Sequence, residues 1–195
     1  MPAQRIAVDG IELHVEIDGA ANADGPTLLL VNGAGLTTRQ WDGVVGRLGE
    51  TRTVIRHDVR GTGASSAGPA SGYRFERYAR DIVEIADRLG VSNFDLWGMA
   101  WGSRVALVTA ANHPGRVRRL VLSDFSVDPA DSEAQKQGAI EAKRARAAAG
   151  IVDPPRPAGL GDHNDREAMR AAMAATLIHP DLLPFVAQVQ APTLI

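Results

Sequence analysis

The sequence predicts an α/β protein in which a mostly parallel sheet carries helices on both faces. Short, continuous apolar runs recur along the chain, as at residues 27–31 and 117–122, and such runs are typical of strands that are covered on both sides. Segments of helical periodicity separate these runs, and turns that contain Gly or Asp end them. Strands that alternate with helices in this way favour an open, mainly parallel sheet.

The elements follow in chain order from an antiparallel edge. Residues 6–8 and 11–17 alternate apolar and polar side chains around Asp9-Gly10, which predicts a β-hairpin. The elements expected after it are a strand at 27–31, a helix at 41–48, a strand at 53–57, a helix at 78–89, a strand at 94–97, a helix that ends before His113-Pro114, and a strand at 117–122.

After residue 127 the pattern becomes helical. Segments 139–149 and 166–178 predict two helices joined by a Pro- and Gly-rich connection. The second helix repeats apolar side chains at Met169, Met173 and Leu177, and we interpret the whole region as a lid above the sheet edge.

The chain is therefore divided into three parts. A core at 1–127 is followed by the helical lid at 128–190 and by residues 191–195, which begin a further apolar strand. Because a domain seldom ends inside a core strand, we expect a truncated strand here and the C-terminal strands of the fold beyond this chain.

Composition and charge exclude several classes of protein. The formal net charge of -2 gives no reason to expect nucleic acid or an acidic membrane surface as a partner. The chain has no cysteine, so disulfides and thiolate chemistry are excluded and a cytoplasmic location is expected. No apolar run suits a signal peptide or a membrane span, and no metal-ligand or dinucleotide-binding spacing occurs, so we expect no membrane partner, no cofactor and no metal.

The segment Gly98-Met99-Ala100-Trp101-Gly102 lies between an expected strand and an expected helix. This is the position and glycine spacing of a nucleophile elbow, a strained turn that lifts its central side chain above the sheet. In a working elbow the central residue is a serine, whereas the methyl group of Ala100 can neither attack a carbonyl nor lose a proton. The sequence thus predicts a nucleophile elbow that has no nucleophile.

Four motifs in this order resemble the α/β-hydrolase fold. They are Asn32-Gly33-Ala34-Gly35 after the first buried strand, Asp58-x-Arg60-Gly61-x-Gly63-x-Ser65 after the next, the elbow at 98–102, and Pro192-Thr193-Leu194-Ile195 after the lid. Within that family the chain is most similar to 3-oxoadipate enol-lactonases, and its Trp101-Gly102-Ser103 segment is similar to proline iminopeptidases. The chain departs from both at the nucleophile.

The resemblance implies acyl transfer from a carboxylic ester or lactone by a Ser-His-Asp/Glu triad. Ala100 takes the nucleophile position, and the backbone N–H groups of Trp101 and Ala34 would bind the oxyanion. The acid and the histidine are expected beyond Ile195. A small-molecule substrate is implied, and an amide substrate and a homo-oligomer stay open. Substrate contacts are assigned to Asn32, Gly33, Gly35, Leu36, Met99 and Phe125.

Other polar residues have simpler interpretations. Asp124 is an alternative acid or a loop cap, and Asp58 is expected to fix the turn after its strand rather than to pair with Arg60. Ser103 is expected inside the helix, away from substrate. The histidines are expected in supporting positions, with His57 and His113 in loop hydrogen bonds and with His163 and His179 in the lid, where they could line the pocket.

Two explanations of Ala100 lead to different functions. In the first, a serine was replaced in a competent hydrolase by a recent or engineered loss. In the second, the natural protein carries the alanine and either binds a small hydrophobic ligand as a pseudoenzyme, or acts as a cyclase or lyase that needs only the oxyanion-stabilising pocket. A strained elbow costs about 1–3 kcal/mol. Both flanking glycines are intact, which favours the first explanation.

Overall fold

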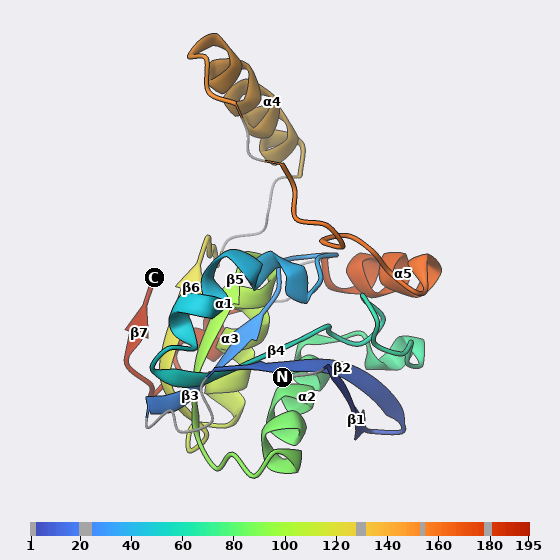
Figure 1. The fold of residues 1–195 in the computed structure, drawn as a ribbon, viewed down its shortest axis with the longest axis vertical. Coiled ribbons are helices and arrows are strands. Elements are labelled where there is room, and N and C mark those ends of the chain that lie inside the picture. Colours follow the sequence, from blue (N-terminus) through green and yellow to red (C-terminus); the bar gives the residue numbers. More distant parts are fainter. Residues whose placement is uncertain (1–2, 20–24, 128–131, 153–154, 178–180) are drawn as a thin grey trace.

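The computed structural model describes residues 3–19, 25–127, 132–152, 155–177 and 181–195 (Figure 1). Within these residues the strands form one seven-stranded sheet in the order β1-β2-β4-β3-β5-β6-β7. β1 pairs antiparallel with β2, and β2 with β4, whereas the remaining neighbours are parallel. The predicted parallel sheet with an antiparallel edge is confirmed. Its strands are β1 (Gln4–Val8), β2 (Ile11–Asp18), β3 (Gly25–Val31), β4 (Arg52–His57), β5 (Phe94–Met99), β6 (Val117–Ser123) and β7 (Thr193–Leu194).

Helices cover both faces of the sheet, as predicted (Figure 1). On one face, Trp41 and Val45 pack against Leu30 of β3 and Val54 of β4. On the other face, two longer helices and the sheet enclose the main apolar core. The helices of this part are α1 (Asp42–Leu48), α2 (Phe75–Arg88) and α3 (Trp101–Asn112), with short 3-10 turns η1 (Thr38–Trp41) and η2 (Ala70–Gly72).

The two long core helices differ in pattern because they differ in burial. α2 is strongly amphipathic, and its buried stripe includes Tyr78, Ile82 and Ile85. α3 is apolar nearly all round, since it lies between the sheet and α2 and its first eleven residues are almost all buried. A helix enclosed in this way can hold the turn that precedes it in a fixed position.

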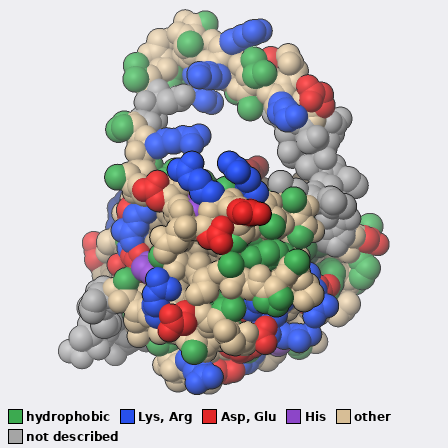
Figure 2. All heavy atoms as spheres, turned by 90° about the vertical axis from the view of Figure 1, so that its right-hand side faces the viewer, with side chains coloured by type: hydrophobic (Ala, Val, Ile, Leu, Met, Phe, Trp, Pro, Cys, Tyr) green, Lys and Arg blue, Asp and Glu red, His purple; other side chains and the backbone are tan. Residues whose placement is uncertain are grey.

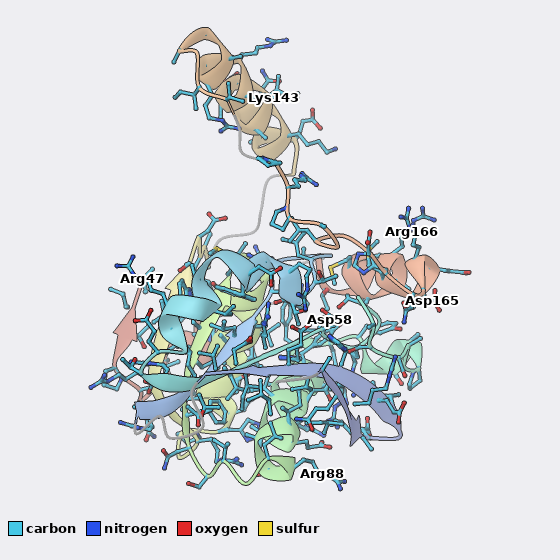
Figure 3. All side chains as sticks on the ribbon, in the orientation of Figure 1. Arg47, Asp58, Arg88, Lys143, Asp165 and Arg166 are labelled. Carbon is cyan, nitrogen blue, oxygen red and sulfur yellow. The ribbon has the colours of Figure 1, made fainter. Side chains whose placement is uncertain are left out.

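The two longer helices of the predicted lid differ in their contacts. α4 (Ser132–Ala148) projects from the body of the molecule, and its described side chains are all exposed (Figure 1). Figure 2 shows several basic side chains on this arm, and Lys143 extends from it in Figure 3. α5 (Arg166–Leu177) instead packs on the body, where Ala172 and Met173 join the main core. The region thus contains a projecting arm and a docked helix.

Several elements differ in extent from the sequence expectations, and one helix was not expected. α4 begins at Ser132 rather than at residue 139, and a four-residue helix that was not expected, α6 (Leu183–Val186), lies against α3. The expected strand at 191–195 is confirmed in shorter form as β7, in which Thr193 pairs with Leu120 of β6. No helix in the described part of the chain is long and apolar enough to span a membrane.

Candidate active site

The predicted elbow is a strained turn between β5 and α3. Ala100 has φ 51° and ψ −113°, in the region of positive φ that residues with a Cβ atom rarely adopt. Its N–H donates to the carbonyl oxygen of Ser123 at 2.8 Å, and its own carbonyl accepts from the N–H of Ser103 at 3.0 Å. These bonds to β6 and to α3 hold the turn in place. The side chain of Ala100 is half-buried at the end of the sheet strand.

Both glycines of the elbow are required by close backbone approaches. A Cβ atom at Gly98 would lie 2.3 Å from the carbonyl oxygen of Gly102. A Cβ atom at Gly102 would lie 2.4 Å from the carbonyl oxygen of Val31 and 2.5 Å from that of Asn32. Real Cβ atoms do not come so near to backbone atoms, so the first turn of α3 meets β5 and the end of β3 only because these side chains are absent.

Ser103 lies inside α3, as expected, and is fully buried. Its hydroxyl oxygen is 2.8 Å from the carbonyl oxygen of Gly98 and 2.9 Å from that of Ser123. The hydroxyl therefore joins the elbow to β6 and is not exposed to a substrate.

The loop after β3 lies against the elbow. The N–H of Gly33 donates to Oε1 of Gln40 at 2.8 Å, and the N–H of Leu36 donates to the carbonyl of Gly33 at 3.1 Å. A Cβ atom at Gly33 would be 3.7 Å from the carbonyl oxygen of Met99, so this loop and the elbow are neighbours. Ala34 at its tip is exposed, while Leu36 and Met99 are half-buried.

Two backbone donors at this junction have no acceptor. Within the described part of the chain, neither the N–H of Ala34 nor that of Trp101 makes a hydrogen bond. Trp101 is the first residue of α3, so its N–H also lies at the positive end of the helix dipole. Free N–H groups of this kind suit an oxygen that carries negative charge.

Asn32 fixes the first loop from within the protein. Its side chain is buried, and Oδ1 accepts a hydrogen bond from Nε1 of Trp41 at 2.7 Å. Its Nδ2 donates to the carbonyl of His57 at 3.0 Å and to that of Leu36 at 3.4 Å. The amide thus joins β3, the end of β4 and the loop, and its hydrogen-bonding groups are directed inward.

Asp58 links this loop to the loop after β4, and Figure 3 shows it between them. Oδ1 accepts from the N–H of Thr38 at 2.8 Å, and Oδ2 accepts from the N–H of Ala64 at 2.9 Å. Burial raises the pKa of this carboxyl, and the two backbone donors oppose that rise. Arg60 pairs instead with Asp81, at 2.7 Å for each of two hydrogen bonds. Asp58 therefore supports the turn, as expected.

A charged cluster supports the same loop from β2. Glu16 accepts hydrogen bonds from Thr38 and Arg39, lies 2.9 Å from a ring nitrogen of His14, and pairs with Arg56 at 2.9 Å. Burial raises the pKa of Glu16, but these hydrogen bonds and the charge of Arg56 together outweigh it and lower the pKa to about 2. The carboxylate is therefore charged at neutral pH, and it holds η1 to the sheet.

Phe125 and Asp124 lie on the β6 side of the elbow. Phe125 lines an apolar cavity of about 310 Å³ together with Leu122 and Val186, and neither Ala34 nor Ala100 contributes to that cavity. Asp124 is exposed with φ 55°, directly after the strand. The structure thus places Phe125 on a different surface from the Ala34 loop.

Among the described residues, no hydrogen bond joins a histidine to the elbow turn at 98–102. We expected His57 to make loop hydrogen bonds, but its ring nitrogen Nδ1 is buried without a partner. Burial lowers the pKa of this ring to about 4. His113 is half-buried at the end of α3, and burial lowers its pKa as well. His163 bridges two loops: its Nδ1 accepts from the N–H of Gly63 at 2.8 Å and its Nε2 donates to the carbonyl of Gly35 at 3.1 Å. His179 lies outside the described residues.

The sequence did not predict the role of His163, because its two partners are 100 and 128 residues away along the chain. The same holds for Thr176, whose hydroxyl accepts a hydrogen bond from the indole of Trp101 across 75 residues. In the described part of the chain no group of three or more His, Cys, Asp or Glu side chains could hold a metal ion.

Comparisons with known proteins agree with this geometry. Residues 26–176 match the family described as alpha/beta hydrolase fold. A relative from Variovorax paradoxus (strain S110), named carbamate hydrolase RutD, is 40% identical over 111 residues, which are 56% of this chain and 41% of the relative. The N-formylmaleamate deformylase of Pseudomonas putida is 35% identical over 119 residues, which are 61% of this chain and 43% of the deformylase.

A solved enol-lactonase from Burkholderia xenovorans LB400 has the same fold. It gives a TM-score of 0.78 at 23% identity, over 97% of this chain and 79% of the lactonase. The chain spans less than half the length of the two relatives named above. The family match covers most of the sequence, and the sheet order, the elbow and the glycine contacts agree with it. The chain therefore belongs to the alpha/beta hydrolase fold family.

Proposed function

We propose that the junction of the Ala34 loop and the elbow is the oxyanion hole of a serine-hydrolase-type site. The observation that carries this proposal is the pair of backbone N–H groups, on Ala34 and Trp101, that have no acceptor among the described residues. A carbonyl oxygen placed between them would accept two hydrogen bonds that strengthen as negative charge develops on it. Asn32 and Asp58 support the site by fixing the loop that carries Ala34.

The chemistry of the parent site would be acyl transfer. A serine at position 100 would attack the carbonyl carbon, a histidine would take its proton, and a carboxylate would orient that histidine. Ala100 supplies no oxygen for this attack, so we propose that this chain polarises a carbonyl compound without cleaving it. Leu36 and Met99, which are half-buried in the loop and the elbow, are proposed as apolar contacts, whereas Phe125 lines a different cavity.

The proposed substrate is a small carbonyl compound with an acyl C–O or C–N bond. A carboxylic ester or lactone is the class that the sequence predicts, and the solved enol-lactonase shares the fold. The names of the two relatives, a carbamate hydrolase and a deformylase, extend the class to amide-type bonds. A carbonyl oxygen is common to all of these compounds, and it is the group that the two N–H donors would bind.

A second candidate function rests on Ala100 itself. If the alanine is natural, the same pocket would hold a small ligand in a pseudoenzyme, or stabilise an oxyanion in a cyclase or lyase reaction that needs no nucleophile. The two candidates differ in one testable respect. Only the hydrolase becomes reactive when a serine is returned to position 100.

Fluorophosphonate labelling of an Ala100→Ser variant tests the hydrolase, and it is done on the longest protein that the gene encodes, because the histidine and the acid are expected beyond Ile195. These probes react with activated serines, and the unchanged protein is the matched control because it keeps every other serine, including the buried Ser103. We expect stoichiometric labelling of the variant alone, mapped to position 100 by peptide mass spectrometry. A folded variant that stays unlabelled would contradict the hydrolase and favour the ligand-binding candidate.

A further inference from the structure

The segment after the projecting arm is fastened to both loops that surround the proposed oxyanion hole. We call residues 157–176 the docked segment. Thr37 joins it twice, through its N–H to the carbonyl of Leu160 at 3.0 Å and through its hydroxyl to the carbonyl of Gly159 at 2.8 Å. The N–H of Asn164 donates to the carbonyl of Gly63 at 2.9 Å. This part of the chain is bonded to the core, whereas the described side chains of α4 are exposed.

His163 is the side chain of this segment that reaches the Ala34 loop. Nδ1 accepts from the N–H of Gly63, so it carries no proton, and Nε2 must then donate to the carbonyl of Gly35. The ring is thus held as one neutral tautomer between the two loops. Gly35 follows Ala34 directly and has φ 62°. Because glycine has no Cβ atom, its own side chain does little to restrict its backbone conformation. The bond from His163 supplies an external restraint next to the first oxyanion donor.

Thr176 holds the second donor through its side chain. Nε1 of Trp101 donates to Oγ1 of Thr176 at 3.1 Å, and that hydroxyl donates in turn to the carbonyl of Ala172 at 2.8 Å. The indole also packs edge-on against Tyr78, with ring centroids 5.1 Å apart, and is almost fully buried. The residue whose N–H faces the oxyanion is therefore anchored on α5 as well as on its own helix.

We infer that the docked segment is a positioning element for the oxyanion hole, with His163 fixing the Ala34 loop and Thr176 fixing Trp101. This inference rests on the proposed function, because it assigns these contacts to the two N–H groups proposed there. It gives the two halves of the predicted lid different roles. The docked half contacts the two loops of the site, whereas the described side chains of the arm α4 are exposed.

One test uses the unchanged protein. Long-range ¹H–¹⁵N spectra report which nitrogen of a histidine carries the proton. We expect His163 to show a bare Nδ1 and a protonated Nε2. The opposite tautomer would overturn its bridge between Gly63 and Gly35, because two hydrogens would then face each other at Gly63.

A second test measures the effect on the site with methylphosphonate, a small tetrahedral anion that resembles the oxyanion. Its dissociation constant is taken from the shifts of the Ala34 and Trp101 amide signals. Thr176→Val keeps the shape but loses the acceptor, and Thr176→Ser keeps the acceptor. His163→Phe keeps a ring but loses both bonds, and Lys143→Ala on the exposed arm is the control. We expect Thr176→Val and His163→Phe each to weaken binding about fivefold, roughly the factor of one neutral hydrogen bond.

The outcomes separate the two proposals. Thr176→Ser and Lys143→Ala should bind within about twofold of the unchanged protein, because hydrogen bonds are lost in neither. Wild-type affinity in folded Thr176→Val and His163→Phe variants would overturn the positioning role and leave the oxyanion hole intact. If the unchanged protein shows no shift at either amide, the proposed oxyanion hole fails, and the positioning role fails with it. Should His163→Phe not fold, Thr176→Val alone decides the positioning role.

Discussion

Replacing Ala100 by glycine should stabilise the protein, although glycine normally weakens a fold. The residue lies at φ 51° and ψ −113°, a region in which a Cβ atom costs about 1–3 kcal/mol. Glycine adopts such angles without that strain, and it loses about 0.5–1 kcal/mol through the greater entropy of the unfolded chain. The difference predicts that Ala100→Gly raises the free energy of unfolding by about 1 kcal/mol.

The same chemical change elsewhere gives the matched control. Ala110 lies inside α3 and is buried, with ordinary helical geometry. Ala110→Gly should lower the free energy of unfolding by about 1–2 kcal/mol, since it combines the helix cost of glycine with the loss of a buried methyl group. The two variants therefore differ in sign.

Urea unfolding followed by tryptophan fluorescence measures both variants. An unchanged m-value with a higher midpoint for Ala100→Gly would show a true gain in stability. If Ala100→Gly lowers the midpoint as much as Ala110→Gly does, the elbow at position 100 is not strained in solution, and the inference from the positive φ is refuted.

Three further predictions concern packing and acid stability. Gly102→Ala should lower the free energy of unfolding by about 3 kcal/mol or more, because the added Cβ meets the backbone of β3. Gly46→Ala in α1, where the added Cβ has open space, should raise it by about 0.5–1 kcal/mol. The midpoints of urea unfolding measure both changes. Glu16 has its pKa lowered from 4.5 to about 2, so it stabilises the fold above pH 4.5 and loses about 3 kcal/mol of that contribution as the pH falls towards 2. Glu16→Gln should flatten this part of the pH–stability curve, and an unchanged slope would contradict the assignment. Burial lowers the pKa of His57 from 6.5 to about 4, so NMR titrations should still show a neutral ring at pH 5. Because the unfolded chain then binds the proton more tightly, folding stability should begin to fall below pH 6.5. Protonation of the folded ring near pH 6.5 would contradict this.

The sequence predicts those parts of the fold that have a local pattern. The buried strands are continuous apolar runs, and the elbow joins such a run to a helix through Gly98 and Gly102, so these elements were found in the right order. The first turns of α4 were missed because residues 132–138 are mainly polar. Every α4 side chain that the structure describes is exposed, so no buried face imposes an apolar stripe on them. α6 was missed because it has four residues, one of which is a proline.

The contacts that fix the candidate site depend on the tertiary fold. Met173, which belongs to the apolar repeat of the predicted lid helix, lies in the main core, because α5 packs onto the body. The side chain of Leu177, expected beside it, lies outside what the structure describes. His163 and Thr176 occur in segments with no motif of their own, and only the folded chain brings them to Gly35 and Trp101. Sequence periodicity shows which face of a helix is buried, but it does not show which distant loop that face meets.

The history of position 100 has to be argued from Ala100 and not from its neighbouring glycines. Gly98 and Gly102 are required by the contact of α3 with β5 and β3, so selection for the fold alone would keep them even in a protein that never hydrolysed anything. The packing does not require alanine at position 100, whose φ is positive, because glycine there would remove the strain. An unrelaxed alanine at the strained position is what a recent or engineered replacement of serine would leave, and we propose that origin on this evidence. Ala100→Ser and Ala100→Gly therefore test the same proposal from two sides, the first through reactivity and the second through stability.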